Sequence, residues 1–515
     1  MFFKFFFFIF PFLLISGPFL PDLFISLISL CFLIYCLSNN IFYLLKKKLI
    51  AFFLIFYFYI NINSFFSFIP SVSYFTTAPY IRMILFSIFV GYLLRSILNI
   101  RKIIFYSFLV SYLILFFDSL IQINTGQNIF GYTIVNNRAS SLFGDKLIMG
   151  SYVSRSFPIL IAISYFENFK YDNFLRLFCI LLAGILVFFS AERVSLFYYL
   201  MTVVVYLVLL PNKKKIFFHI VLLTAVFTAL IFYKPSTAKR IYNHTLEQAF
   251  ETKKKTGIHL FSHRHEAHFI TAFRMFLDKK FIGHGVKSFR YLCDKSPYDM
   301  KDIITDDNAV FSPISGYFFI LHEDTLIRYY VIEEDKKKDF LKIIESLKIE
   351  KTSDDYFVIG RDRAKLDFFV KNNFINYFIA TASLLNSAQH STFVKKGDFI
   401  YSESQYSNGC NTHPHSTHLQ ILAELGFLGY LFLFSFLVYV IALFARAVFG
   451  LILKNNSLRD EKCNLYLAFI TIGLIQSFFP LLPSGNIFNN WISSFIYFKL
   501  GFLFNYLYYE RQSHK

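Results

Sequence analysis

The sequence has few charged residues for its length. Asp, Glu, Lys and Arg make up 16% of the 515 residues, whereas hydrophobic residues make up 56% and the mean hydropathy is +0.51. A soluble domain carries about 25% charged residues, so this composition excludes an ordinary soluble protein. Apolar runs of membrane-spanning length recur along the chain. They predict an all-α polytopic membrane protein.

Other familiar signals are also missing. No small-x-small cleavage site follows the first apolar run, and a second run comes directly after it, so we expect a first membrane span rather than a removable signal. No internal repeat is visible in the sequence, although such repeats are typical of transporters. The Gly-x-Gly at residues 283–285 lacks the strand-to-helix setting of a nucleotide-binding fold. A transporter is therefore a lower alternative.

Basic and aromatic residues are abundant. The net charge is +18, which suits nucleic acid, but basic residues on cytoplasmic loops explain it in a membrane protein. The 72 Phe and 34 Tyr are typical of a chain encoded by an AT-rich genome, and we assign no cofactor to them. Membrane lipids, and no nucleic acid, are the expected partners.

About twelve apolar runs are predicted to cross the membrane, some of them short or tilted. The chain then divides into transmembrane helices 1–9 at residues 1–233, a large external loop at residues 234–417, and transmembrane helices 10–12 at residues 418–515. The runs start near Phe5, Asp22, Leu49, Arg82, Ile103, Leu147, Leu175, Ser195, Ile216, Leu419, Leu465 and Asn489.

The exit of every second span is basic. Because basic loops face the cytoplasm, both termini are predicted to be cytoplasmic. Residues 124–146, the turn at 190–193 and the segment 234–417 are then external, since long loops cross the membrane regardless of their charge. The basic residues are Lys46, Lys47, Lys48, Arg101, Lys102, Lys170, Arg176, Lys213, Lys214, Lys215, Arg446, Lys454, Arg459, Lys462, Arg511 and Lys515.

The middle of the external segment, at about residues 294–400, is predicted to be a small α+β insertion. The stretch YFFILHEDTLIRYYVIEED contains β-like apolar and aromatic runs, and DFLKIIESLKIE has apolar residues at helical spacing. The stretch NFINYFIATASLL predicts an interfacial or core helix. The insertion is either a module that recognises an acceptor or a partner, or a lineage-specific decoration.

Two cysteines bracket this insertion. Cys31, Cys36, Cys179 and Cys463 lie in or beside apolar runs, where a thiol behaves as a small apolar group. Cys293 and Cys410 lie in the external segment, where an oxidising compartment favours a disulfide. Such a bond would hold His415 near the membrane surface, whereas the alternative is two buried free thiols.

A histidine-rich motif closes the external segment. The stretch HPHSTHLQILAELGFLG contains His413, His415 and His418. It matches the pattern His, small polar residue, two residues, Leu-x-x-Leu-x-Glu-x-Gly-x-x-Gly, with the elements His415, Ser416, Leu419, Leu422, Glu424, Gly426 and Gly429. A Ser-x-x-Arg turn ends at Arg193, and an Arg-then-Gly-x-Gly-x-x-x-Phe segment contains Arg264, Gly283, Gly285 and Phe289.

This combination resembles the family of O-antigen ligases and O-antigen polymerases of bacterial envelopes. The likeness covers the order of elements over most of the chain, outside residues 294–400. It implies a metal-independent, GT-C-like glycosyltransferase of the inner membrane, with no cofactor, working on the periplasmic face. The implied donor is an undecaprenyl diphosphate-linked glycan, and the implied acceptor of a ligase is lipid A–core.

The chain departs from this family at two positions. Lys280 and Phe281 stand where the family often has Pro before the glycine pair. Ser416 stands where the family usually has Asn, so a supporting hydrogen bond is expected to differ.

Residue chemistry supports roles for the charged groups. Arginine donates two parallel hydrogen bonds to phosphate oxygens and keeps its proton, so we expect Arg193 to bind the diphosphate, with Arg138, Arg264 and Glu192 also at the substrate. A neutral imidazole takes a proton near neutral pH, and we assign this role to His415. A lone His here is more often a polar cap or a switch.

The remaining motif residues are expected to be structural. Glu424 is too far along its helix to orient His415, so it pairs with a neighbouring span or orients a loop; Gly283, Gly285, Gly426 and Gly429 are expected in turns and close contacts. The spacing of the three histidines does not suit a metal site. The leading hypothesis is an O-antigen ligase; the alternatives are an O-antigen polymerase and a transferase of glycan to protein.

Overall fold

A computed structural model describes most of the chain as two compact units. The described residues are 2–39, 47–135, 137–249, 263–293, 295, 297–298, seven strands between 308 and 403, 410–452, 458–480 and 482–510. Unit 1 comprises residues 1–62, 74–247 and 430–515, and unit 2 comprises residues 63–73 and 248–429. Residues 63–73 therefore group with residues 248–429, and residues 234–247 group with unit 1.

Unit 1 is helical. Helices α3, α4, α11 and α16 pass from one unit to the other. The elements with residues in unit 1 are α1 (Phe2–Ile15), α2 (Phe19–Ser38), α3 (Lys48–Phe65), α4 (Pro70–Thr77), η2 (Ala78–Tyr80), α5 (Ile81–Ser96), α6 (Ile100–Thr125), η3 (Ser141–Phe143), α7 (Met149–Phe166), α8 (Asp172–Ser190), α9 (Arg193–Val208), α10 (Lys213–Tyr233), α11 (Pro235–Ala249), α16 (Thr417–Ile452), α17 (Leu458–Ser477), α18 (Asn490–Asn505) and η5 (Tyr506–Glu510).

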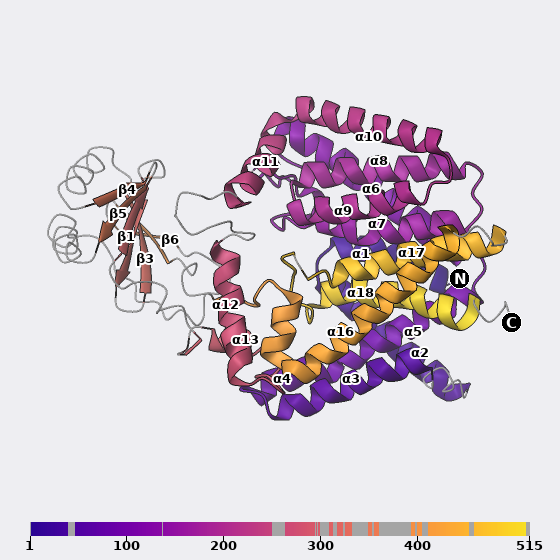
Figure 1. Ribbon diagram of the computed structural model, residues 1–515, viewed down its shortest axis with the longest axis horizontal. Coiled ribbons are helices and arrows are strands. Elements are labelled where there is room, and N and C mark those ends of the chain that lie inside the picture. The colour runs from indigo at the N-terminus through magenta and orange to yellow at the C-terminus, as the bar shows by residue number, and fades with distance from the viewer. Residues whose placement is uncertain are drawn as a thin grey trace. The chain divides into compact units, whose positions relative to one another are not determined.

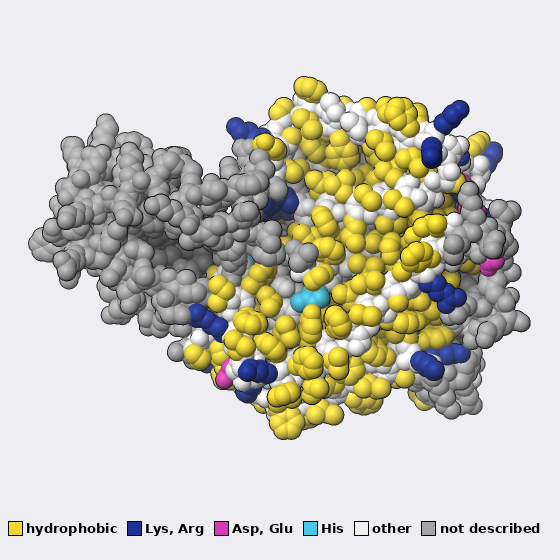
Figure 2. All heavy atoms as spheres, in the orientation of Figure 1, with side chains coloured by type: hydrophobic (Ala, Val, Ile, Leu, Met, Phe, Trp, Pro, Cys, Tyr) yellow, Lys and Arg dark blue, Asp and Glu magenta, His cyan; other side chains and the backbone are white. Residues whose placement is uncertain are grey.

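Seven described helical segments are long and apolar enough to cross a membrane. On the face drawn in Figure 2, hydrophobic side chains cover the helices of unit 1, and Lys and Arg lie near its edges. The chain is therefore a membrane protein, while the count of twelve spans stays a prediction. The seven segments are Phe19–Ser38, Lys48–Phe65, Pro70–Ser96, Ile100–Thr125, Asp172–Ser190, Lys213–Tyr233 and Thr417–Ile452.

Small residues allow close helix packing in unit 1. Helices α5 and α18 lie side by side (Figure 1). Gly501 of α18 meets Val90 and the backbone of Ser87 so closely that a Cβ there would overlap both, and Gly91 lies against the carbonyl of Gly501. Helices in membranes gain packing contacts in this way, because lipid supplies no hydrophobic drive between them.

Unit 2 combines helices with a sheet. Its elements besides those shared with unit 1 are α12 (His263–Asp278), α13 (Phe289–Leu292), β1 (Asn308–Ser312), β2 (Tyr317–His322), β3 (Thr325–Val331), β4 (Ile349–Thr352), β5 (Asp355–Ile359), β6 (Phe393–Lys396) and β7 (Phe399–Glu403). The strands form one antiparallel sheet in the order β4-β5-β1-β2-β3-β7-β6.

The β-like runs of the predicted insertion correspond to β2 and β3, which pair as a hairpin from Tyr317 opposite Tyr330 to His322 opposite Thr325. Residues 349–350, which end the predicted helical stretch, are in strand β4. The rest of that stretch, the predicted helix at residues 373–385, and the basic residues Lys46, Lys454, Arg511 and Lys515 lie outside the described residues.

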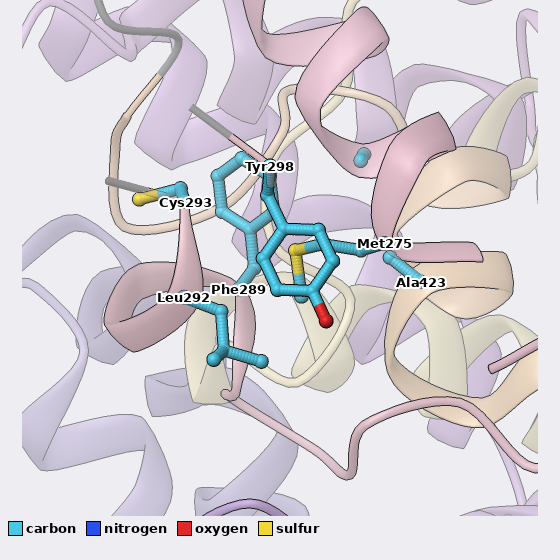
Figure 3. Close-up of a cluster of buried hydrophobic side chains, with 7 residues drawn as sticks. Met275, Phe289, Leu292, Cys293, Tyr298 and Ala423 are labelled. Carbon is cyan, nitrogen blue, oxygen red and sulfur yellow. The ribbon is translucent and has the colours of Figure 1, made fainter. Parts of the chain in front are cut away.

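The expected disulfide is present in unit 2. Cys293 and Cys410 are bonded, with their Cα atoms 5.1 Å apart. Cys293 belongs to a buried apolar cluster with Met275 of α12, Phe289 of α13 and Ala423 of α16, and Cys410 packs against this cluster (Figure 3). The bond therefore fixes both ends of the insertion to the core that supports the His415 motif.

Helix α16 is broken at Gly426, where the backbone has φ 65° and ψ −167°. The loop at residues 280–285 satisfies the hydrogen bonds that the break would otherwise leave open. His284 N–H donates to the carbonyl of Ala423 (3.0 Å), and Gly285 N–H to that of Glu424 (2.7 Å). In return, the N–H groups of Phe427 and Leu428 donate to the carbonyls at positions 280 and 281.

The glycines of both motifs permit this contact. A Cβ on Gly426 would overlap the carbonyl of Phe281, and a Cβ on Gly283 would overlap the backbone of Glu424. Both glycines also have positive φ, which a side chain disfavours. The carbonyls of Lys280 and Phe281, the positions that depart from the family pattern, accept the two return hydrogen bonds.

Replacing Gly426 with Ala should destabilise the protein by about 3 kcal/mol or more, because steric overlap adds to the strain of positive φ. The matched control is Gly126→Ala, where φ is +86° and no atom lies within 4 Å of the new Cβ; it should cost about 1 kcal/mol. Thermal unfolding in detergent measures both. Equal losses in the two variants would show that the backbone contact has no role.

His284 should make unit 2 less stable in acid. Its Nε2 contacts the carbonyl of Met275 (3.0 Å), and burial is the main cause that lowers its pKa. Because the folded pKa lies below the unfolded value of about 6.5, stability is full above that value and is lost as the pH falls through the folded pKa. The thermal midpoint should fall as the pH drops below about 6.5, and His284→Gln should flatten this slope. An unchanged slope in the variant would refute the assignment.

Candidate functional site

The predicted site residues are divided between the two units. Arg138, Glu192 and Arg193 belong to unit 1. Unit 2 contains Arg264, Gly283, Gly285, Cys293, Cys410, His415, Glu424, Gly426 and Gly429.

Glu192 is the centre of a polar network in unit 1. Its carboxylate accepts hydrogen bonds from the Gly150 N–H (2.9 Å) and from the hydroxyls of Ser151 (2.7 Å) and Ser195 (3.0 Å). Gly150 and Ser151 lie in the first turn of α7, where a negative charge compensates the free N–H groups and the helix dipole. Glu192, expected at the substrate, thus holds the start of α7 against α9.

Arg138 completes this network. Its Nη2 lies 3.7 Å from Glu192 Oε1 and donates to the carbonyl of Leu147 (2.7 Å), while its Nε donates to that of Ser190 (3.1 Å). Burial raises the pKa of the Glu192 carboxyl, which these hydrogen bonds and Arg138 oppose. Burial likewise lowers the pKa of Arg138, which Glu192 opposes. Each member of the Arg138–Glu192 pair therefore stabilises the charged form of the other against burial.

Arg193 lies in a cluster of three arginines. It is the first residue of α9 and is half-buried. Arg138 feels repulsion from Arg193 and from Arg240 of α11, so all three charges act on the same region of unit 1. The helix dipole at the start of α9 adds positive potential. Such a region attracts a multiply charged anion.

An apolar groove of about 790 Å³ lies on the same unit. It runs between α8, α9, α10 and α11, and Lys239 and Ile241 on its wall flank Arg240 in the sequence. The groove therefore adjoins the segment that carries Arg240. Its other walls include Phe188, Leu196, Phe227 and Ile231.

His415 is held in an unusual backbone conformation in unit 2. Its φ is +54°, a region that non-glycine residues seldom occupy and that is often found at functional sites. Asn411 Nδ2 lies 3.0 Å from His415 Nε2, while Asn411 Oδ1 accepts the backbone N–H of Thr412 (2.7 Å). The backbone donor fixes which atom of the amide is oxygen, so Nδ2 donates to Nε2. The imidazole is therefore neutral, with its lone pair on Nε2.

Three further histidines surround His415. The ring centroids of His265, His268 and His413 lie 5.3, 5.3 and 4.2 Å from that of His415. Among the described residues, no group of three or more His, Cys, Asp or Glu side chains is arranged to hold a metal ion. The four rings therefore form a cluster in which the His265 ring lies edge-on to His415 and the other two rings are tilted against it.

The other motif residues have structural positions. Ser416 Oγ accepts the N–H of Leu419 at the start of α16 (3.4 Å), so the serine caps this helix, and Asn411 supplies the hydrogen bond to His415. Glu424 is fully buried and accepts a hydrogen bond from Gln420. The backbone N–H groups of Lys287 and Phe289 also act on its carboxylate, so it orients the loop after Gly285. Arg264 is in α12, and its side chain lies outside the described residues.

Sequence reasoning missed several residues of these groups. Asn411, His265 and His268 contact or adjoin His415, and Arg240 joins the arginine cluster. The stretch SHRHEAHF at 262–269 was a visible signal for the two α12 histidines. Nothing in the local pattern marks Asn411 or Arg240.

No protein-family model, no curated protein and no solved structure matches this chain.

Removing the Glu192 carboxylate should destabilise unit 1. Glu192→Ala leaves Arg138 and three donors without their shared acceptor, so we expect a loss of about 3 kcal/mol. Glu167→Ala is the control, because Glu167 makes one ion pair at 3.6 Å with Arg101 and should cost about 1 kcal/mol or less. Thermal unfolding in detergent compares the two. If they lose the same stability, Glu192 is not the organising group.

Proposed function

We propose that the chain is a glycosyltransferase of the O-antigen ligase type, which transfers a glycan from undecaprenyl diphosphate to lipid A–core in lipopolysaccharide biosynthesis. The observation that supports it most is the neutral His415 imidazole, whose Nε2 lone pair is defined by Asn411. The resemblance of the surrounding motif to this family gives the reaction class.

In the proposed reaction, an acceptor hydroxyl displaces Asn411 as the hydrogen-bond donor to His415 Nε2. Nε2 takes the hydroxyl proton while the hydroxyl oxygen bonds to the anomeric carbon of the donor sugar. The bond between that carbon and the phosphate oxygen breaks, and the lipid diphosphate leaves with the electron pair. A positioned base of this kind contributes about 10²–10⁴-fold to a rate.

The leaving diphosphate gains negative charge, which unit 1 is suited to stabilise. Arg193 and Arg240 are half-buried and belong to the same positive region as Arg138. Arg138 is already bonded to two carbonyls and to Glu192, so in the proposal it holds the region together. Arg193 and Arg240 bind the diphosphate oxygens, with Arg264 as a further candidate.

The apolar groove between α8 and α11 suits the polyprenyl chain of the donor. Its apolar walls would bury isoprenoid methylenes, each worth about 0.8 kcal/mol. Arg240 lies between two residues of the groove wall, so a chain bound there would carry its diphosphate toward the arginines.

The proposal includes the predicted topology. About twelve helices would cross the bacterial inner membrane in a GT-C-like arrangement, with both termini in the cytoplasm and the reaction on the periplasmic face. The basic residues at alternate loops support this orientation. The Cys293–Cys410 disulfide also fits an external compartment.

An O-antigen polymerase, which joins lipid-linked repeat units, is the alternative, because it uses the same donor and the same base. The glycan of a strain without the protein separates the two. Loss of all attached glycan indicates a ligase, and a single repeat on lipid A–core indicates a polymerase. Transfer to protein and transport are lower alternatives.

The proposed roles predict the activity of two variants. His415→Ala should lower glycan transfer by about 10²–10⁴-fold, and Arg193→Lys by about 10²-fold, because a lysine cannot reproduce the planar fork. Transfer from a lipid-linked donor to lipid A–core, read by gel shift at equal protein level, measures both.

Unit 1 contains a histidine and an arginine that serve as matched controls for these variants. His219 is a buried histidine bonded to Tyr206 and Lys215, and Arg82 pairs with Asp22 at 2.7 Å. His219→Ala and Arg82→Lys should keep the transfer rate of folded protein unchanged. Full activity of both His415→Ala and Arg193→Lys would disprove the mechanism.

A further inference from the structure

Arg155 is a buried cation of unit 1 to which the proposed reaction assigns no role. It lies in α7, between the first turn that Glu192 holds and Pro158, and it is 8% exposed. Its Nε is buried and makes no hydrogen bond, and no hydrogen bond or ion pair of its guanidinium is found within the described part of the chain. Glu192 and Tyr198 act on it only electrostatically.

Arg176 of α8 is a buried arginine of the same unit whose guanidinium is hydrogen-bonded. It is also 8% exposed. Its Nη1 donates to the carbonyl of Ser164 (2.8 Å), its Nη2 donates to Asn173 Oδ1 (2.8 Å), and its guanidinium lies over the Tyr165 ring. The two arginines have equal burial, yet only Arg176 is satisfied by the protein.

Arg155 acts electrostatically on a buried lysine. Lys499 of α18 is 1% exposed, and its Nζ donates to the carbonyl of Gly473 (2.7 Å) and to Ser477 Oγ (2.9 Å). An ammonium has three donors, so one remains. Lys499 and Arg155 repel each other, and Gly473 packs against both Pro158 and the Lys499 side chain. Helices α7, α17 and α18 therefore meet at this pair of cations.

No carboxylate in the described chain balances this pair. Glu192 is the only acidic group that acts on Arg155, and its oxygens already accept from Gly150, Ser151 and Ser195 beside Arg138. Charged groups buried among membrane helices are costly and usually functional. A buried guanidinium without a hydrogen-bonded counter-charge calls for an anionic ligand.

We propose that Arg155, with Lys499, binds a phosphate-class oxyanion inside the helix bundle of unit 1. The guanidinium fork matches two phosphate oxygens, and a phosphate monoester or diphosphate carries the required charge. Resting on the proposed function, this site would take the donor diphosphate together with the Arg193 region; the oxyanion binding itself requires no transfer activity.

The test compares three proteins, each the full chain in detergent: wild type, Arg155→Met and Arg176→Met. Binding of inorganic diphosphate and of farnesyl diphosphate is measured by calorimetry, and the thermal midpoint is measured without ligand. The wild type should bind at least one probe. Arg155→Met should weaken that binding at least tenfold, while its ligand-free midpoint stays equal or rises, because an unpaired buried charge has been removed.

Arg176→Met should show the opposite pattern, with a lower midpoint and unchanged affinity. Arg155→Lys, which keeps the charge, should bind more tightly than Arg155→Met, and this variant serves if the methionine protein does not fold. Binding of inorganic diphosphate identifies a site for the free ion, and binding of farnesyl diphosphate alone identifies a lipid headgroup.

Two outcomes would overturn the proposal: wild-type protein that binds neither probe, or Arg155 variants that bind with wild-type affinity. Failure of the proposed function is a separate result. In that case the wild type transfers no glycan, whether or not Arg155 is required for diphosphate binding.

Discussion

The backbone contact between residues 280–285 and the break in α16 is the constraint on which unit 2 depends. Membrane helices tolerate a break only where other groups satisfy the exposed N–H and carbonyl groups. Here four hydrogen bonds do so. Glu424 then orients the loop after Gly285, α13 packs on α12 and α16, and the disulfide joins this core to the chain entering His415. The position of His415 therefore depends on a backbone contact that only glycines allow.

In unit 1 a buried carboxylate, rather than a backbone contact, connects the helices around the predicted site. One carboxylate, Glu192, ties the start of α7 to α9 and neutralises Arg138. Arg155 of the same unit has a buried Nε that makes no hydrogen bond, whereas Arg176 shows that the fold is able to satisfy a buried arginine fully.

Sequence reasoning reached the features that local patterns encode. Apolar length predicted the membrane helices, and two cysteines in the predicted external segment predicted their bond. The glycines were expected in turns and close contacts, where the structure has them. Asn411 and Arg155 could not be found in this way, because a single polar residue has no period. Asn411 matters because the fold places it beside the imidazole of His415. Arg155 matters because its buried guanidinium has no hydrogen-bond acceptor among the described residues.

The Cys293–Cys410 bond spans 117 residues of sequence with its Cα atoms 5.1 Å apart. The chain therefore leaves the core at Cys293 and returns to it at Cys410, at nearly the same point. Insertions, deletions or exchanges between the two cysteines leave the separation of those anchors unchanged. The position of the histidine five residues beyond Cys410 therefore does not depend on the length of the segment between the two cysteines.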